Sequence, residues 1–352
     1  SNTAQREGGG VGMVESDATL TGNTISNNES VGGSDGINIS LSPATLTNNT
    51  ISANLGRGVF VDRSAVTLHN NTIISNTLGG LFLWECDNAR VTGNTISYNT
   101  NSSGIWTNGD NVTIQGNTIS HNTADWFAGV DISGGSENVK FSGNTISSNT
   151  AVNGGGGVSF SGYGDLVGNT FISNTAGGSG GGLYLHDSSG EESISGNTFI
   201  GNSATEGGAI ILAGGNPLLI NNVMVDNQST NNGSAIQISD GVAHARLVHN
   251  TLARNQGGDG SGIYAYGTTI ALTNTIVVSH TVGVYVHFDA SASFDSTLWG
   301  DGTWANGTDL AGGGTINNTN DHSGDPDFVD YLAGDYHIGE NSAARDKGVD
   351  AG

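Results

Sequence analysis

One short phrase recurs eleven times along this chain of 352 residues. Most copies read apolar-x-(Gly/Asn)-Asn-Thr-apolar-x-x-Asn, and successive copies lie 22 to 28 residues apart. A repeat of about 25 residues is typical of solenoids, in which each repeat packs only on its neighbours. The first Asn of the phrase stands at Asn23, Asn49, Asn71, Asn94, Asn117, Asn144, Asn169, Asn197, Asn222, Asn250 and Asn274.

The apolar residues in and before the phrase predict three short strands per repeat. One apolar residue stands three positions before the first Asn, as at Leu46, and another stands two positions after it, as at Ile51. Many copies are preceded by Gly-apolar-x-apolar, as at residues 58–61. Alternation with period two indicates strands. We therefore expect an all-β fold, a parallel β-helix of about twelve three-stranded coils over residues 1–300.

The Asn residues suit both the bends and the stacking of such a solenoid. Asn tolerates left-handed backbone angles, which tight bends require. Equivalent residues of successive coils lie about 4.8 Å apart, so the eleven first Asn side chains should form a structural ladder of amide hydrogen bonds. A second Asn follows five residues after the first in ten copies, and Ser279 replaces it in the eleventh.

This pattern resembles the right-handed parallel β-helix repeat proteins of the pectin-lyase-like superfamily. The resemblance covers about residues 1 to 300 and implies a right-handed coil. It implies no single activity, because a fold of this kind carries lyases, hydrolases, adhesins and phage spikes.

The last fifty or so residues lose the repeat and predict a loop-rich C-terminal cap over residues 301–352. Three pieces in it resemble the closing segment of bacterial surface proteins of the polymorphic-outer-membrane and choice-of-anchor types. This resemblance implies an exported protein and no catalytic residue. The pieces are Asp325-Pro326-Asp327-Phe328-Val329-Asp330, Gly334-Asp335-Tyr336-His337-Ile338 and Ser342-Ala343-Ala344-Arg345-Asp346-Lys347-Gly348.

Composition narrows the range of partners. The formal net charge is −23, from 9 basic and 32 acidic residues, which argues against nucleic acid and anionic membranes. No apolar run approaches the ~18 residues of a membrane span. The lone Cys86 excludes an internal disulfide. Ser1-Asn2-Thr3-Ala4 matches the close of a repeat, so open strand edges at the solenoid ends could pair with other copies or with neighbouring surface proteins.

Strand alternation also predicts one candidate binding face. If Val59 and Val61 point inward, their neighbours point outward, and the aromatic residues of three successive repeats should stack beside polar groups. Rings with nearby carboxylates and amides suit a polysaccharide. The face comprises Phe60, Asp62, Phe82, Trp84, Trp106, Asn108 and Asp131. A weaker cluster comprises Tyr184, His186, Asp187, Tyr264, Tyr266, Tyr285 and His287.

Two other interpretations of this face remain open. The aromatic row could be ordinary strand stacking, or it could contact another protein chain. Calcium is the metal ion that the acidic groups could bind, with Asp62, Glu85, Asp87 and Asp110 as the candidates. No motif selects a pair of catalytic carboxylates, and His186 and His287 are more simply surface histidines.

The sequence thus favours an exported bacterial surface or extracellular-matrix protein with a structural or adhesive role. Such a protein could assemble end to end into a fibre. The alternative is a carbohydrate-active module, a polysaccharide lyase, a glycoside hydrolase or a glycan-binding domain, that uses the face from Phe60 to Trp106.

Overall fold

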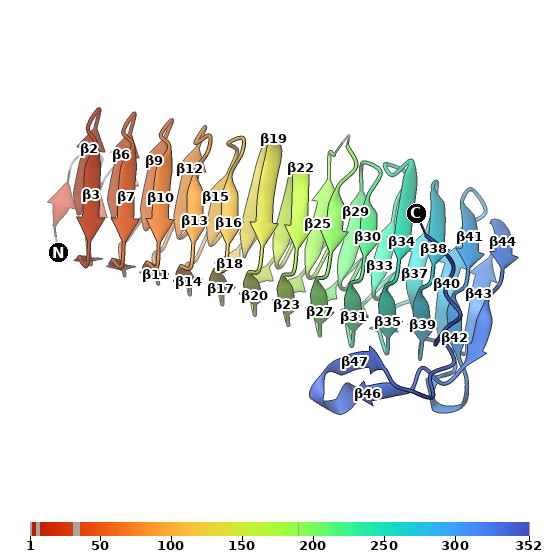
Figure 1. The fold of residues 1–352 in the computed structure, drawn as a ribbon. Helices are drawn as coiled ribbons and strands as arrows, with labels where there is room; N and C mark the ends of the chain where they lie inside the picture. Colours follow the sequence, from red (N-terminus) through yellow and green to blue (C-terminus); the bar gives the residue numbers. More distant parts are fainter. Residues whose placement is uncertain (1, 5–7, 31–35, 189, 352) are drawn as a thin grey trace. The chain divides into compact units, whose positions relative to one another are not determined.

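The computed structural model describes residues 2–4, 8–30, 36–188 and 190–351. They divide into two compact units, Ser1–Gly178 (unit 1) and Ser179–Gly352 (unit 2). Short parallel strands follow one another coil on coil within each unit (Figure 1). The helical elements of the described residues are two 3-10 turns, η1 (Gly302–Trp304) and η2 (Tyr331–Ala333). No helix in this part of the chain is long and apolar enough to cross a membrane.

Three stacks of parallel strands make the coils of unit 1. Stack A contains β2 (Val11–Val14), β6 (Ile37–Ser40), β9 (Val59–Asp62), β12 (Leu81–Trp84) and β15 (Ile105–Thr107). Stack B contains β3 (Ala18–Thr21), β7 (Ala44–Thr47), β10 (Val66–His69), β13 (Arg90–Thr92) and β16 (Thr113–Gln115). Stack C contains β4 (Thr24–Ser26), β8 (Thr50–Ser52), β11 (Thr72–Ile74), β14 (Thr95–Ser97), β17 (Thr118–Ser120), β20 (Thr145–Ser147) and β23 (Thr170–Ile172).

The last two coils of unit 1 merge stacks A and B. The long strands β19 (Val130–Ser142) and β22 (Val158–Val167) each run through both stacks, with register shifts after Ile132. Two-residue strands complete the bends: β1 (Thr3–Ala4), β5 (Glu29–Ser30), β18 (Thr123–Ala124), β21 (Thr150–Ala151) and β24 (Thr175–Ala176).

Unit 2 repeats the three stacks. Stack A contains β25 (Leu183–His186), β29 (Ile210–Ala213), β33 (Ile236–Ile238), β37 (Ser261–Ala265), β40 (Val282–Val286) and β43 (Thr308–Gly312). Stack B contains β26 (Ser193–Ser195), β30 (Leu218–Ile220), β34 (His244–Val248), β38 (Thr269–Thr273), β41 (Ser291–Asp295) and β44 (Thr315–Thr319). Stack C contains β27 (Thr198–Ile200), β31 (Val223–Val225), β35 (Thr251–Ala253), β39 (Ile276–Val278), β42 (Leu298–Gly300) and β45 (His322–Gly324). The short strands are β28 (Ser203–Ala204), β32 (Gln228–Ser229) and β36 (Gln256–Gly257).

The described residues therefore form seven coils in unit 1 and six in unit 2, slightly more than the sequence predicted. The sixth coil of unit 2 lies beyond residue 300, in the segment that was expected to be a loop-rich cap. Its strands pair in parallel with the coil before it and end at Gly324. The repeat phrase does not occur in this coil, because a polar residue other than Asn bonds to the backbone of the coil before it. Asp321 Oδ1 accepts from the Thr297 backbone N–H at 2.8 Å, and Asp321 Oδ2 accepts from the Trp299 indole.

The Asn side chains bind the coils of each unit to one another. Asn94 is typical, because its Nδ2 donates to Asn117 Oδ1 at 3.0 Å while its own Oδ1 accepts from the backbone and amide nitrogens of Asn71. The same bonds recur from Asn23 to Asn169 and from Asn197 to Asn250. The second Asn of the phrase forms a parallel row, as in Asn99 to Asn122. Every coil thus satisfies buried backbone groups of its neighbours.

Asn274 is a correction to the predicted ladder. The strand register pairs Leu252 with Val277, so the eleventh copy of the phrase is displaced by one residue. Thr275 occupies the ladder position, and its Oγ1 donates to Leu247 O. The Asn274 side chain lies outside the ladder and makes two hydrogen bonds with the backbone of Val349, at 2.8 and 2.9 Å. It therefore holds the C-terminal tail on unit 2.

A hairpin follows the last coil and packs on the outer face of stack C in unit 2. Its strands are β46 (Phe328–Asp330) and β47 (Asp335–Ile338), which pair in antiparallel fashion around η2 and run beneath stack C in Figure 1. The hairpin buries Phe328 and Tyr336 against outward-facing apolar residues of that stack, among them Val225, Ile276 and Val278.

Candidate functional site

The predicted aromatic residues meet on stack A of unit 1. Register pairs Phe60 with Phe82 and Phe82 with Trp106 on successive coils. The ring centroids of Phe60 and Phe82 are 5.6 Å apart, and those of Phe82 and Trp106 are 4.1 Å apart with planes only 9° from parallel. The Arg57 guanidinium lies 4.3 Å from the Phe82 centroid. The rings therefore cover one another's faces, and this row stabilises the stack as cross-strand aromatic pairs do.

Trp84 is the exposed ring of this face. Its side chain stacks on Trp106 with centroids 5.5 Å apart and remains 42% exposed. Asp62 lies opposite Trp84 on the preceding coil. Arg63 donates to both carboxylate oxygens of Asp62, at 3.0 and 2.9 Å, and these bonds hold the pKa of Asp62 below its usual range. The Trp84 ring therefore lies beside the Asp62–Arg63 ion pair, and these charged groups can still form hydrogen bonds with a ligand.

Asp131 lies beside this face but is buried. It pairs in register with Trp106 and is only 8% exposed, and its Oδ1 has no hydrogen-bond partner among the described residues. Burial raises the pKa of Asp131 to about 7, although hydrogen bonds from Trp106 and Ser159 act in the opposite direction. The Asn108 side chain is used by the backbone, because its Oδ1 accepts from the N–H of Glu85 at 2.6 Å.

The carboxylates proposed as calcium ligands serve the backbone of neighbouring coils. Asp87 Oδ1 accepts from Asp110 N at 2.9 Å, and Asp110 Oδ1 accepts from Glu137 N at 2.9 Å. Asp62 is already paired with Arg63. In the described part of the chain, no three His, Cys, Asp or Glu side chains converge in a way that could hold a metal ion. The structure therefore does not gather the predicted set, Glu85 included, into one site.

The weaker tyrosine cluster lies on stack A of unit 2. Tyr264 and Tyr285 stack with centroids 5.1 Å apart and planes 5° from parallel. His287 Nδ1 lies 2.6 Å from Asp289 Oδ1, and the neighbouring Phe288 is 75% exposed. Tyr184 stacks on His186 of the same strand. Only the stack of Tyr264 on Tyr285 follows the strand register, whereas the other contacts join residues two positions apart in the chain.

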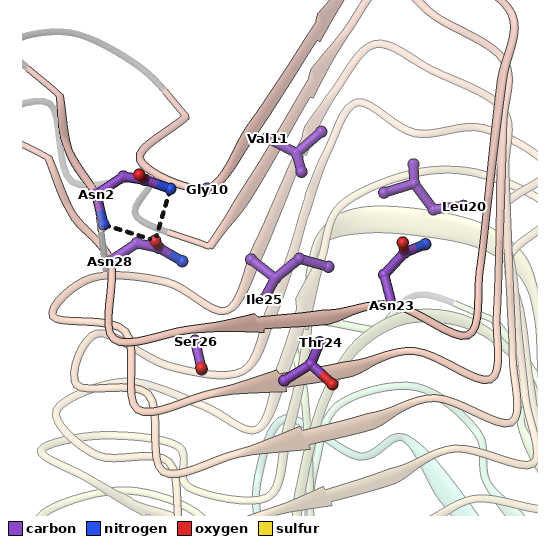
Figure 2. Close-up of a pocket in the computed structure, with 9 residues that line it drawn as sticks. All are labelled: Asn2, Gly10, Val11, Leu20, Asn23, Thr24, Ile25, Ser26 and Asn28. Carbon is purple, nitrogen blue, oxygen red and sulfur yellow. Dashed lines mark hydrogen bonds between the residues drawn. The ribbon is translucent and has the colours of Figure 1, made fainter.

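A hollow of about 400 Å³ opens at the first coil of unit 1 (Figure 2). Val11, Leu20 and Ile25 line it, and in Figure 2 they point into the interior of the coil, while Asn2 donates to Asn28 Oδ1 at its edge. These are ordinary core and ladder positions of the repeat. The hollow is the mouth of the solenoid in the described residues, and it contains no residue that the other coils lack.

Sequence reasoning missed the role of Arg254 in docking the hairpin. Arg254 donates to both carboxylate oxygens of Asp226, at 2.9 and 2.6 Å, and to the hydroxyl of Tyr336 at 2.5 Å. Its guanidinium also lies 5.1 Å from the Tyr331 ring centroid. One signal in the sequence indicates that the outer face of stack C is covered in unit 2, although it does not identify the hairpin. The Thr-Ile-Ser of stack C in unit 1 becomes Val-Met-Val and Ile-Val-Val in unit 2, so that both faces of the strand are apolar.

Comparisons with known proteins agree with this architecture. Residues 9–176 match the family described as right handed beta helix region, and residues 128–313 match the family described as periplasmic copper-binding protein (NosD). A search of curated proteins found no match.

Two solved structures are similar to this chain. One is the catalytic unit of the thermostable GH87 alpha-1,3-glucanase from Streptomyces thermodiastaticus strain HF3-3, with 15% identity, a TM-score of 0.35, and coverage of 86% of this chain and 62% of that one. The other is PfbA, a surface adhesin of Streptococcus pneumoniae, with 12% identity, a TM-score of 0.31, and coverage of 88% and 72%. At these values neither structure informs the activity of this chain.

The stacked parallel coils, the Asn ladders and the first match define a right-handed β-helix repeat protein. The second match spans more than half of the sequence, and the chain belongs to the NosD family.

Proposed function

We propose that this protein is an exported, non-catalytic β-helix that adheres to polysaccharide through the face from Phe60 to Trp106. The observation that carries the proposal is Trp84, a 42% exposed ring continuous with the aromatic row and adjacent to the Asp62–Arg63 pair. A pyranose ring can pack on an indole while charged groups bind its hydroxyls. Export agrees with the periplasmic description of the family.

The carboxylates of this face argue for adhesion over hydrolysis. A low pKa at Asp62 and a raised pKa at Asp131 would suit a base and an acid. However, three coil steps separate them, from β9 through β12 and β15 to β19. At about 4.8 Å per step this is roughly 14 Å, whereas glycosidases hold their two carboxylates about 5 to 9.5 Å apart.

A glycan array tests the proposal. Wild-type protein should bind a subset of polysaccharides, and Trp84→Ala should weaken that binding about fivefold or more, if stacking of a sugar on the indole is worth about the 1–3 kcal/mol of a base stacked on an aromatic ring. Tyr98→Ala is the matched control. Tyr98 is 52% exposed and stacks on His121, but it follows stack C on another side of the coil.

Two results would overturn the proposal. One is the absence of any bound glycan, and the other is an equal loss of binding in Trp84→Ala and Tyr98→Ala. Release of reducing sugar or of unsaturated product from a bound polysaccharide would instead support the carbohydrate-active alternative.

Copper is the ligand that the family description suggests, and the residues of this chain do not fit a preformed copper centre. Cys86 is fully buried, its Sγ lies 3.2 Å from Trp84 O, and burial raises the pKa of the thiol to about 11. Copper binds thiolate in preference to thiol. Met13 and Met224 are core residues. Within the described ranges, no cluster of three metal-binding side chains replaces them.

A further inference from the structure

A groove in unit 2 separates the C-terminal hairpin from the solenoid. Two adjoining hollows, of about 360 and 560 Å³, share the lining residues Asn221, His249, Thr251, Tyr336 and His337. We call them together the cap groove. Its floor contains the first residues of successive stack C strands, Thr198, Val223, Thr251, Ile276, Leu298 and His322. Strand β47 forms one wall, and Lys347 and Gly348 of the tail close one end.

The cap groove lacks the acidic excess of the chain. Three of the nine histidines and one of the two lysines line it, namely His249, His322, His337 and Lys347. One acidic residue, Asp335, lines it as well, and its Oδ1 is bound to His337 Nδ1 at 2.6 Å. A net charge of −23 makes this concentration of basic groups unusual for the molecule.

Most of these donors are not used by the protein itself. Across the described residues, no hydrogen bond, ion pair or ring contact involves the side chains of His249, His322 or Lys347. By contrast, Arg63, Arg254 and Arg246 each pair with a carboxylate. Basic side chains that remain unpaired in so acidic a chain, and that line one hollow, suit a negatively charged ligand.

The apolar part of the lining selects the kind of anion. Ile338 on the wall is 40% exposed, and the nearly buried Ile276, Leu298 and Tyr336 enclose the hollow around it. A small inorganic ion would leave this surface and most of the 360 Å³ hollow unfilled. Hollows of 300 Å³ and more suit organic ligands, with apolar lining and a few polar groups that fix orientation.

We propose that the cap groove binds an organic anion, a carboxylate on a ring-sized body, with the carboxylate at Lys347 and His322 and the ring against the exposed Ile338. The site is separate from the aromatic face of unit 1 and does not depend on the function proposed above. Such a carboxylate could come from a free sugar acid or from an acidic residue within a polysaccharide. Because the docked hairpin forms one wall, a bound anion should also stabilise the hairpin.

NMR titration of the full chain tests this site with glucuronate and with glucose, its neutral counterpart. Glucuronate should shift the amide signals of His249, His322, His337 and Lys347, with an affinity at least tenfold above that of glucose and weakened by salt. A glucuronate-containing tetrasaccharide is the third probe. Tighter binding of the tetrasaccharide assigns the carboxylate to a polymer, and equal binding assigns it to a free sugar acid.

Lys347→Gln is the decisive variant, because Lys347 is exposed and its loss leaves the core intact. It should weaken glucuronate binding at least fivefold, and His322→Gln should act in the same direction. Lys140→Gln, which changes the other lysine of the chain on an exposed position of β19, should leave binding unchanged. Equal affinity for glucuronate and glucose would overturn the proposal. So would equal effects of the two lysine variants, or shifts confined to residues outside the cap groove.

Discussion

At the scale of single residues, His280 shows how a substitution can preserve the second Asn row. It is fully buried by its neighbours, its Nε2 accepts from Asn255 Nδ2 at 3.1 Å, and its Nδ1 lies 3.3 Å from Asn306 Oδ1. These partners require the neutral ring, with the proton on Nδ1. Burial lowers the pKa of His280 to about 4, since a second proton would face the Asn255 amide.

His280 should therefore reduce stability in acid. In the unfolded chain the histidine binds a proton near pH 6.5, whereas folded His280 resists protonation until about pH 4. The stability that neutral His280 contributes is therefore fully present above pH 6.5 and is lost as the pH falls toward 4. The variant His280→Asn restores the amide. Relative to wild type, its free energy of unfolding should rise by about 2.5 kcal/mol as the pH falls from 7 to 4.5. Urea unfolding at both pH values measures this gain, and His121→Asn, an exposed control, should show none.

Glu192 makes the opposite contribution. It is fully buried at a core position beside Ser188, Glu192 Oε2 has no partner in the described part of the chain, and burial raises its pKa to about 7. The folded protein thus holds the proton longer than the unfolded chain, and stability falls as pH rises from about 4.5 through 7.

The variant Glu192→Gln should remove this dependence. Relative to wild type, its free energy of unfolding should rise by about 3 kcal/mol between pH 4.5 and pH 8. Urea unfolding midpoints at the two pH values measure this rise. Glu191→Gln alters the exposed neighbour and is the control. A gain that does not change with pH would contradict the assignment of the buried proton to Glu192.

At the scale of elements, the C-terminal hairpin depends on Arg254. Arg254 holds Asp226 through both carboxylate oxygens, donates to Tyr336 and lies over the Tyr331 ring. Lysine cannot reproduce these planar contacts. Arg254→Lys should therefore weaken hairpin docking by about 1–3 kcal/mol, seen as faster amide hydrogen exchange in residues 328–338. Arg246→Lys, which alters an exposed ion pair with Glu191, should leave exchange there unchanged.

The strands of the repeat could be predicted from sequence, while the hairpin contact could not. Ile51 stands between Thr50 and Ser52 and is buried, so the phrase itself indicates which side faces the core. Arg254 and Tyr336 are 82 positions apart and share no periodic pattern. The aromatic face could be predicted because strand register places Phe82 beside Trp106. Register does not tell how exposed each ring is, so the greater exposure of Trp84 is known only from the structure.

At the scale of the whole molecule, the ladder explains why the repeat phrase fades without ending the coils. A ladder position needs only a side chain that can bond to buried backbone groups of an adjacent coil. Thr275 and Asp321 meet this need at the first row and His280 meets it at the second. The repeat phrase is defined by its Asn residues, so it does not include these substitutes. For this reason the phrase assigned Asn274 to the ladder and left residues 301–324 in a cap.

Because each coil bonds to the coils next to it, the stability lost when an Asn of the ladder is replaced should depend on the position of its coil. Asn94 lies between two coils, and Asn94→Ala would leave Asn71 N and Leu68 O without their partners. Each buried group left unsatisfied costs about 1–3 kcal/mol, so we expect the two groups together to cost about 2–6 kcal/mol. Asn23 is exposed at the first coil, where its amide bonds only Thr21 O and Asn49.

Asn23→Ala should thus cost less than about 1 kcal/mol. Urea unfolding of the full chain, followed by circular dichroism, compares the two variants. Asn153→Ala alters an exposed Asn outside both rows, at a position without a positive φ, and this control should behave like wild type. Equal losses at Asn23 and Asn94 would mean that the ladder stabilises the solenoid through each side chain alone, without coupling between coils.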